Sequence, residues 1–266
     1  MAIPKIIHYC WFGDKDLPQK AQKCIRSWKK KCPDYQIIEW NESNFDLTQN
    51  RYCREAYEAK KWAFVTDYAR LKILYEHGGV YFDTDVELRK RLDPLLENEA
   101  FMGIENSTRC VKVATGLALG AEKGNPVIKA LLDSYEDSVF RREDGTLDIT
   151  TCTERNHLVL SRLGYVEENC LQKLPGATVY PTEYFSPMQM ESGILDLTKN
   201  TYSIHHYSLS WTTQEEQNRR KEHLAKQRRL EFFYRVKVLP NRILLSVLGM
   251  EKYEELKKWV KRLSRA

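Results

Sequence analysis

Long apolar runs and paired cysteines are both missing from this sequence. No stretch reaches about 18 residues without a charged side chain, so we expect no transmembrane helix. The opening residues, "MAIPKIIHYCWFG", lack a basic segment followed by an apolar one, and we therefore expect no secretory signal. The seven cysteines are scattered and never form a Cys-x-x-Cys pair. This pattern argues against a zinc knuckle or a disulfide framework and predicts a reducing, cytoplasmic location.

Internal repeats and low-complexity linkers are missing too, and the composition is that of an ordinary globular protein. Of the 266 residues, 42% are hydrophobic and 30% are charged, which suits a sizeable core and excludes a disordered or fibrous chain. The net charge of +5 is uneven. Residues 211–266 hold 15 Lys and Arg against 7 Asp and Glu, whereas the preceding 210 residues hold 27 against 30. We therefore predict a body of residues 1–212 and a basic, amphipathic helical extension of residues 213–266.

Strand-like and helix-like segments alternate along the body. Enrichment in β-branched and aromatic residues predicts strands at residues 3–12, 35–40, 80–82, 100–105, 114–121 and 202–207. Apolar spacing and end signals predict helices at residues 18–31, 51–60, 66–77, 125–137 and 155–164. Thr66 and Asn125 are expected N-caps, and Gly78 is expected to end a helix. The alternation predicts an α/β fold with a largely parallel sheet.

Two aspartates follow one of the predicted strands directly. In the segment "GGVYFDTDVEL", Asp83 and Asp85 come after the apolar residues 80–82. On a continuing strand both side chains point to the same side, and ligands of parallel sheets bind at the carboxyl ends of strands. Paired carboxylates suit Mg²⁺ or Mn²⁺ bridged to a diphosphate. The alternative is a solvated surface turn, but the apolar residues 80–82 directly before the aspartates argue against it.

Two further pairs of polar residues are candidates for the same site. Asp67 and Arg70 lie three residues apart on a predicted helix and share a face. They form either a local ion pair or a contact to a phosphate and a sugar hydroxyl. His205 and His206 lie on a predicted strand, so they point to opposite sides and at most one reaches a given metal.

Four blocks of the sequence together resemble a known family. "IPKIIHYCWFG", "WNESN", "VTDYARLKILYEHGGVYFDTDVEL" and "HHYSLSW" occur in the order and spacing of glycosyltransferase family 32, the DXD sugar-binding glycosyltransferases. Many bacterial members act in capsule or lipopolysaccharide synthesis. The resemblance covers residues 3–211, and it extends distantly to the glucosyltransferase domains of large clostridial toxins. It implies a Rossmann-like α/β fold of the GT-A type, a nucleotide-diphospho-sugar donor, a Mn²⁺ or Mg²⁺ ion, and retention of anomeric configuration.

The resemblance also assigns roles by position. It implies catalytic roles for Asp67, Arg70, Asp83 and Asp85. It implies donor contacts for Cys10, Trp11, Phe12, Asn44, Val65, Asp67, Arg70, Asp83, Thr84, Asp85, Ser210 and Trp211. Asp85 would bind the metal directly, Asp83 would do so through water, and His206 would add a ligand, with His205 left open. Glu154 and Asn156 fall on the acceptor side.

These features predict a cytoplasmic, metal-dependent, retaining hexosyltransferase. UDP-galactose and UDP-glucose are the favoured donors, and a surface polysaccharide or lipid-linked oligosaccharide is the expected acceptor. For residues 213–266 two uses stay open. Apolar positions at helical spacing between Tyr253 and Leu263, surrounded by Lys and Arg, suit an anionic membrane surface, and they equally suit packing on the body or on a second subunit. No nucleic-acid-binding module is recognisable, so we expect no nucleic-acid partner.

Three other functions remain as alternatives. A toxin-like enzyme would glycosylate a protein. A phosphatase of the haloacid-dehalogenase kind would use Asp83 as nucleophile, but it needs a late acidic pair after a strand. The nearest pair, Asp144 and Asp148, follows charged residues instead. A non-catalytic protein would bind a nucleotide-sugar without turnover.

Overall fold

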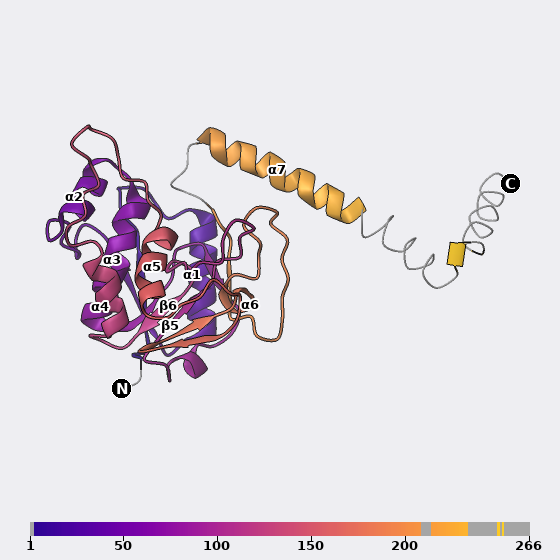
Figure 1. Cartoon of the computed structure of the whole chain (residues 1–266), viewed down its shortest axis with the longest axis horizontal. Coiled ribbons are helices and arrows are strands. Elements are labelled where there is room, and N and C mark those ends of the chain that lie inside the picture. The colour runs from indigo at the N-terminus through magenta and orange to yellow at the C-terminus, as the bar shows by residue number, and fades with distance from the viewer. Residues whose placement is uncertain (1–2, 209–213, 234–248, 251, 253–266) are drawn as a thin grey trace. The chain divides into compact units, whose positions relative to one another are not determined.

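The computed structural model describes residues 3–208, 214–233, 249–250 and 252 of the chain (Figure 1). The chain divides into two units, Met1–Thr213 and Gln214–Ala266. This division lies one residue from the boundary predicted from charge. The separate function predicted for the second unit stays a prediction.

A seven-stranded sheet forms the centre of the first unit, with strand order β2-β1-β3-β6-β5-β8-β7. Its strands are β1 (Ile6–Cys10), β2 (Gln36–Trp40), β3 (Gly79–Tyr81), β5 (Ala100–Gly103), β6 (Leu119–Ala121), β7 (Gln172–Leu174) and β8 (Ala177–Tyr180). Strand β1 runs parallel to β2 and β3, and β5 runs parallel to β8. Strands β6 and β7 are antiparallel to their neighbours. A two-stranded antiparallel sheet joins β4 (Val86–Leu88) to β9 (Ser203–His205).

Helices cover both faces of the large sheet. They are α1 (Gln19–Lys31), α2 (Arg51–Glu58), α3 (Trp62–His77), α4 (Pro126–Asp133), α5 (Cys152–Arg162) and α6 (Thr182–Phe185), with a 3₁₀ turn η1 at Asp93–Leu95. Two core clusters result, one with α2 to α5 and one with α1 (Figure 1). Tyr81 belongs to the first cluster, whereas Val80 and Phe82 belong to the second, because successive strand residues point to opposite faces.

The strand directions bring several loops to one edge of the large sheet. Because β3 and β5 are both antiparallel to β6, they run in the same direction, which β1 shares. The carboxyl ends of β1, β3 and β5 therefore meet at one edge, together with the amino end of β6. Residues that follow β3 and β5 and precede β6 can thus form one site, although they are distant in sequence.

The fold agrees with most of the predicted elements and differs at two places. Every predicted strand and helix of the body has a counterpart, Asn125 caps α4 by accepting from the N–H groups of Val127 and Ile128, and Gly78 ends α3. Helix α3, however, begins at Trp62, so the prediction of Thr66 as its N-cap is wrong. The Thr66 hydroxyl instead donates to the carbonyl of Ala63, one turn earlier in the helix, at 2.7 Å.

The predicted strand at 114–121 is also shorter than expected. Only Leu119–Ala121 pairs with β3 and β5, whereas the preceding residues form a turn in which the N–H of Leu117 donates to the carbonyl of Ala114 at 3.3 Å. That turn places the carbonyl of Gly116 on the N–H of Asp83 at 3.0 Å. Strands β4, β7 and β8 and helix α6 were not predicted, because each is only three or four residues long.

Most of the described part of the second unit is helix α7 (Gln214–Phe233), which confirms the predicted helix after residue 213. Charged residues of both signs are distributed along its length, and Arg219, Lys226 and Arg229 are exposed. The apolar positions between Tyr253 and Leu263 lie outside the described residues. Among the residues that the structure describes, no helix combines the length and apolar character that a membrane span needs.

Candidate active site

Asp83 and Asp85 lie at the carboxyl edge of the sheet, in the link between β3 and β4. The chain turns here, and the N–H of Val86 donates to the carbonyl of Asp83 at 3.1 Å. The two carboxylates are therefore brought together by a turn and not by a continuing strand. The strand before them is fully buried, which fixes where the turn begins.

Strand β9 and the residues after it hold Asp85 from the other side. Oδ1 of Asp85 lies 3.0 Å from Nε2 of His205, and Oδ2 accepts from the N–H of Ser208 at 2.7 Å. Burial alone would raise the pKa of the Asp85 carboxyl, but the charge of His205 and the bonds from His205 and Ser208 hold that pKa below its ordinary value. Burial alone would lower the pKa of His205, which the carboxylate of Asp85 raises instead. The site therefore retains an ionised carboxylate despite its burial.

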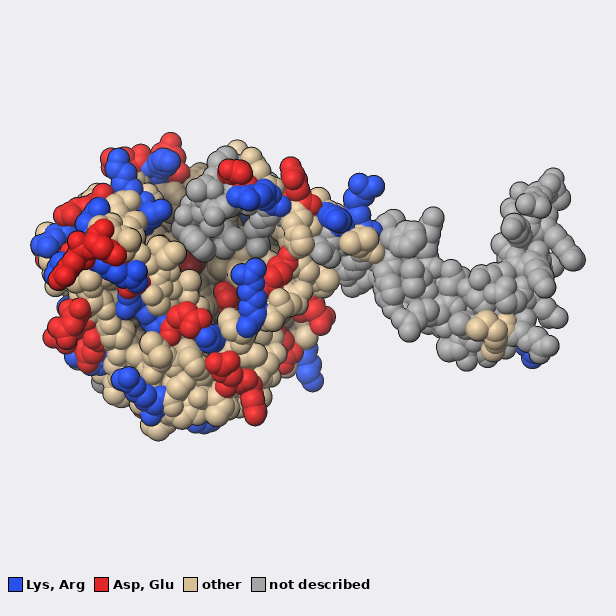
Figure 2. Space-filling view, turned by 45° about the horizontal axis from the view of Figure 1, so that its top comes forward, with Lys and Arg blue, Asp and Glu red and all other residues tan. Residues whose placement is uncertain are grey.

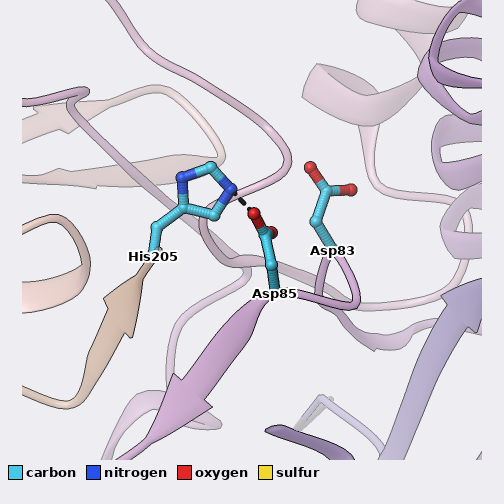
Figure 3. A group of neighbouring side chains, drawn as sticks. All are labelled: Asp83, Asp85 and His205. Carbon is cyan, nitrogen blue, oxygen red and sulfur yellow. Dashed lines mark ion pairs between the residues drawn. The ribbon is translucent and has the colours of Figure 1, made fainter. Parts of the chain in front are cut away.

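Asp83, Asp85 and His205 together form a group that suits a divalent cation (Figure 3). One ligand atom from each residue can be chosen so that all lie within 4.8 Å of one another. Figure 3 shows the carboxylates of Asp83 and Asp85 side by side, with the imidazole of His205 against Asp85. Two carboxylates and one imidazole are a donor set that Mn²⁺ accepts and that Mg²⁺ tolerates. The residues present therefore fit the predicted metal.

A buried guanidinium adjoins this group. The side chain of Arg70 is 3% exposed, and its Nη2 lies 2.5 Å from Oδ1 of Asp67 and 3.7 Å from Oδ1 of Asp83. Its Cζ lies over the ring of Tyr81, 5.1 Å from the centroid, and the hydroxyl of Tyr81 donates to Oδ1 of Asp83 at 3.0 Å. Arg70 and Asp67 are thus more than the surface ion pair that the sequence left open. They form a buried ion pair whose guanidinium also faces the first aspartate of the motif.

Asp67 itself is in an environment that disfavours its charge. Burial raises the pKa of the Asp67 carboxyl to about 6, although the neighbouring guanidinium of Arg70 acts in the opposite direction. The thiol of Cys152, at the start of α5, also acts to lower the pKa of this carboxyl. Asp67 therefore depends on Arg70 to remain ionised at neutral pH.

The turn before β6 completes the site. Its residues, Thr115 and Gly116, were not among those predicted from the sequence. A β-carbon at Gly116 would overlap Oδ2 of Asp83, so only glycine leaves room for this carboxylate. Oγ1 of Thr115 accepts from Nη1 of Arg70 at 3.4 Å. A glycine within an otherwise strand-like segment, "ATGLALGA", was the signal that could have identified this close approach.

The structure groups His205, and not the predicted ligand His206, with Asp83 and Asp85. Val86 pairs with His205 in the register of β4 and β9, which turns the His205 side chain to Asp85. The side chain of His206 points away and contacts Glu87, with Nε2 3.1 Å from Oε2. Only the backbone N–H of His206 contacts the site, where it donates to the carbonyl of Asp85 at 3.1 Å.

Several predicted donor-binding residues occupy core or loop positions. The side chains of Cys10, Phe12 and Val65 are buried in the first core cluster, whereas Trp11 is half-buried. Asn44 is exposed, but its amide is used within its own loop. There Oδ1 accepts from the N–H of Asn41 and Nδ2 donates to the carbonyl of Glu39. Thr84 is half-exposed in the turn between the aspartates.

The remaining predicted residues lie at three different places. Glu154 is exposed and pairs with Lys112 at 2.8 Å. Asn156 is 2% exposed and lies behind Thr115, where its Nδ2 donates to the carbonyl of Val113 at 3.2 Å. Burial therefore argues against contact between Asn156 and an acceptor. Ser210 and Trp211 lie outside the described residues, and their predicted roles stay predictions.

Comparison with known proteins relates part of the chain to one family. Residues 18–102 match the family described as "Glycosyltransferase sugar-binding region containing DXD motif". This match contains the turn with Asp83 and Asp85, and it confirms the predicted resemblance to the DXD glycosyltransferases. The mixed sheet with helices on both faces also confirms the predicted α/β fold, whereas its assignment to the GT-A type stays a prediction.

Individual relatives are known from fungi and bacteria. Inositol phosphoceramide mannosyltransferase 3 of Schizosaccharomyces pombe is 31% identical over 137 residues, which are 48% of this chain and 35% of that protein. Subversion of eukaryotic traffic protein A of Legionella pneumophila is 25% identical over 169 residues, 53% of this chain and 26% of that protein. The chain thus spans about a third or less of the length of these relatives.

Solved structures with a similar arrangement include two glycosyltransferases. The PaToxG glycosyltransferase superposes with a TM-score of 0.45 at 21% identity, over 61% of this chain and 72% of that one. The galactosyltransferase LgtC superposes with a TM-score of 0.40 at 14% identity, over 83% of this chain and 95% of that one.

The different positions of the two histidines lead to a direct prediction. We expect His205→Ala to lower the affinity for Mn²⁺ at least about tenfold, because even residues behind a metal ligand are worth about 10- to 100-fold. We expect His206→Ala, which removes a contact to Glu87 only, to leave that affinity nearly unchanged. Titration of Mn²⁺ followed by electron paramagnetic resonance would measure both. Greater loss in His206→Ala than in His205→Ala would contradict this assignment.

Proposed function

We propose that this chain is a metal-dependent, retaining glycosyltransferase that transfers a hexose from a nucleotide-diphospho-sugar. The observation that carries the proposal is the group of Asp83, Asp85 and His205 beside the buried Arg70, inside the region that matches the DXD glycosyltransferases. Carboxylates without a counter-cation would repel a diphosphate, so the arrangement makes chemical sense with a divalent ion. The proposed metal is Mn²⁺ or Mg²⁺.

The residues of the chain have separate tasks in this reaction. Asp85 and His205, with Asp83 near them, would hold the cation, which when bound offsets the negative charge of the departing diphosphate. Arg70 is fixed by Asp67 and Thr115 with its guanidinium toward Asp83, so it places a permanent positive charge at the same edge. A charge that is already oriented needs no reorganisation as the bond breaks. Trp11, at the end of β1, is the proposed contact for the nucleotide base.

The identities of donor and acceptor belong to the same proposal. UDP-galactose and UDP-glucose remain the favoured donors, and a nucleotide-linked mannose joins them because the Schizosaccharomyces pombe relative is named a mannosyltransferase. The acceptor is proposed to be a saccharide, either in a surface polysaccharide or linked to a lipid. The name of the same relative, which includes inositol phosphoceramide, supports a lipid-linked acceptor.

A cytoplasmic location at the inner membrane face would suit such an acceptor. Acidic and basic side chains are interspersed over the face of the first unit shown in Figure 2, without a broad area of one sign. The basic excess of the sequence lies in residues 211–266 instead. We therefore propose that the second unit, and not the catalytic body, supplies any attraction to an anionic membrane.

The phosphatase alternative receives no support from the contacts of its acidic pair. Oδ1 of Asp144 accepts from the N–H and hydroxyl of Thr146 within one loop. Asp148 pairs with Arg155 and accepts from Thr150. Both carboxylates are thus engaged in contacts of their own segment.

A panel of nucleotide-sugars tests the proposed function. Purified protein would be incubated with UDP-glucose, UDP-galactose or GDP-mannose, with Mn²⁺ or with EDTA, and the released nucleotide would be measured. We expect slow hydrolysis of one donor, which EDTA abolishes because the diphosphate then lacks its counter-ion. Binding of each donor would be measured in parallel by calorimetry. No metal-dependent binding of any nucleotide-sugar would rule the proposal out.

A further inference from the structure

A carboxylate outside the predicted set lies at the same edge of the sheet. Glu105 follows strand β5, whose carboxyl end meets that of β3 at this edge, with the turn of Thr115 and Gly116 between them. Neighbouring strands are about 4.8 Å apart, so the ends of β3 and β5, separated by β6 alone, are about 10 Å apart. The diphosphate and the sugar of one nucleotide-sugar are together long enough to span the distance between these two strand ends.

Backbone hydrogen bonds hold the segment around Glu105, whereas no described residue bonds to its carboxylate. The N–H of Glu105 donates to the carbonyl of Lys112 at 2.9 Å, and the N–H of Asn106 donates to Oγ of Ser186 at 3.1 Å. Among the described residues, no hydrogen bond or ion pair engages the Glu105 carboxylate. Burial raises the pKa of this carboxyl, and His205 is the positive group that acts on it most. A partly buried, unpaired carboxylate costs free energy, which a ligand with hydrogen-bond donors would offset.

The neighbours of Glu105 connect it to the metal group. Ser186, which accepts from Asn106, shares a hydrogen bond of 2.5 Å with the hydroxyl of Tyr207. The ring of Tyr207 packs edge-on against His205, with centroids 4.3 Å apart. The segment with Glu105 therefore lies beside the histidine of the candidate metal group. In the strand order it lies toward β5 and away from β1.

The orientation of the nucleotide-sugar along the sheet edge determines which part of the nucleotide-sugar reaches Glu105. This step rests on the proposed function. A nucleotide-diphospho-sugar is linear, with the base at one end, the diphosphate in the middle and the sugar at the other end. If the base contacts Trp11 after β1 and the diphosphate lies at Asp85 after β3, the sugar extends toward the end of β5. Sugar hydroxyls are hydrogen-bond donors, which is the chemistry that an unpaired carboxylate requires.

We propose that Glu105 binds hydroxyl groups of the transferred sugar and contributes to the choice of that sugar. It is a substrate-binding residue in this role and not a metal ligand. Its carboxylate accepts from hydroxyls whose orientation differs between hexoses, so it favours one hexose over its epimers. A carboxylate to which no described residue bonds lowers the stability of the free protein. This cost gives a second, independent prediction about stability.

Comparison of nucleotide with nucleotide-sugar tests the inference. The affinities of UDP, UDP-glucose, UDP-galactose, GDP and GDP-mannose would be measured with Mn²⁺ for the wild type, Glu105→Gln and Glu97→Gln. Glu97 is exposed and precedes β5, so it lies at the opposite edge of the sheet and serves as the matched control. We expect Glu105→Gln to bind the preferred nucleotide-sugar about 10- to 100-fold more weakly, since bonds to a charged acceptor are worth that factor. The affinity for the bare nucleotide should not change.

Two further readouts separate the inference from other roles of Glu105. We expect Glu105→Gln without ligand to unfold at a higher temperature than the wild type, because the charge of a partly buried carboxylate to which no described residue bonds is removed. A variant that unfolds at a much lower temperature would instead mark a structural role and overturn the inference. Loss of Mn²⁺ affinity without nucleotide would show that Glu105 pairs with His205, and it would overturn the inference too.

Failure of the inference can be distinguished from failure of the proposed function. If the wild type binds the nucleotides and nucleotide-sugars but Glu105→Gln weakens all of them equally or none, only the role of Glu105 is wrong. If the wild type binds none of the five compounds, the proposed function is wrong and the role of Glu105 fails with it.

Discussion

Replacement of Asp85 with asparagine is expected to reduce metal-dependent release of nucleotide by about 10²- to 10³-fold, the usual cost of losing one preorganised electrostatic contact. The asparagine side chain would have the same size as the aspartate, but it would lack the negative charge that faces His205 and that a cation requires. The neutral amide would also weaken the bond from the N–H of Ser208. Nucleotide release from the preferred donor, with saturating Mn²⁺ and with EDTA, would measure the effect.

Glu87→Gln is the matched control for this substitution. Glu87 is two residues further along, but it lies outside the metal group and contacts His206 and Arg89. The same loss of one negative charge should therefore leave nucleotide release nearly unchanged. Equal losses in the two variants would mean that general charge, and not the position of Asp85, supports activity. Full metal-dependent activity in Asp85→Asn would contradict the assignment of the site.

Replacement of Arg70 with methionine is expected to destabilise the protein by about 3–5 kcal/mol, which is typical for removing one partner of a buried ion pair. Methionine approximates the length of the aliphatic part of arginine, so the main change is loss of the guanidinium. Asp67 would then keep its burial without its counter-charge, and Asp83 would lose the nearest positive group. Urea denaturation at neutral pH would measure the free energy of unfolding.

The double variant Asp67→Asn with Arg70→Met tests whether the unpaired charge of Asp67 causes this destabilisation. It removes the buried charge that Arg70→Met leaves unpaired, so we expect it to be more stable than Arg70→Met alone. A double variant less stable than the single one would show that packing of Arg70 on Tyr81, and not its charge, accounts for the effect. Arg70→Lys would keep the charge but lose the planar contacts to Thr66 and Thr115.

Local sequence patterns were sufficient to predict most elements of the body. Asn125 followed by proline predicts the start of α4, and Gly78 predicts the end of α3, because both effects depend only on the backbone nearby. Thr66 failed as a predicted cap because a threonine inside a helix can donate to a carbonyl of the preceding turn equally well. Strands β4, β7 and β8 are too short to show a period of two.

The sequence alone indicated the resemblance to the DXD glycosyltransferases, the alternating α/β organisation and the position of Asp83 and Asp85 after a buried strand. These are local properties, carried by the order of residues within one segment. Only the tertiary structure decided between His205 and His206, because that choice depends on the register of β4 with β9, which are more than a hundred residues apart. It also decided that Arg70 is buried against Asp83, that Gly116 leaves room for this carboxylate, and that Glu105 shares its edge of the sheet. Contacts between distant segments depend on how the strands are ordered, and no spacing within one segment encodes that order.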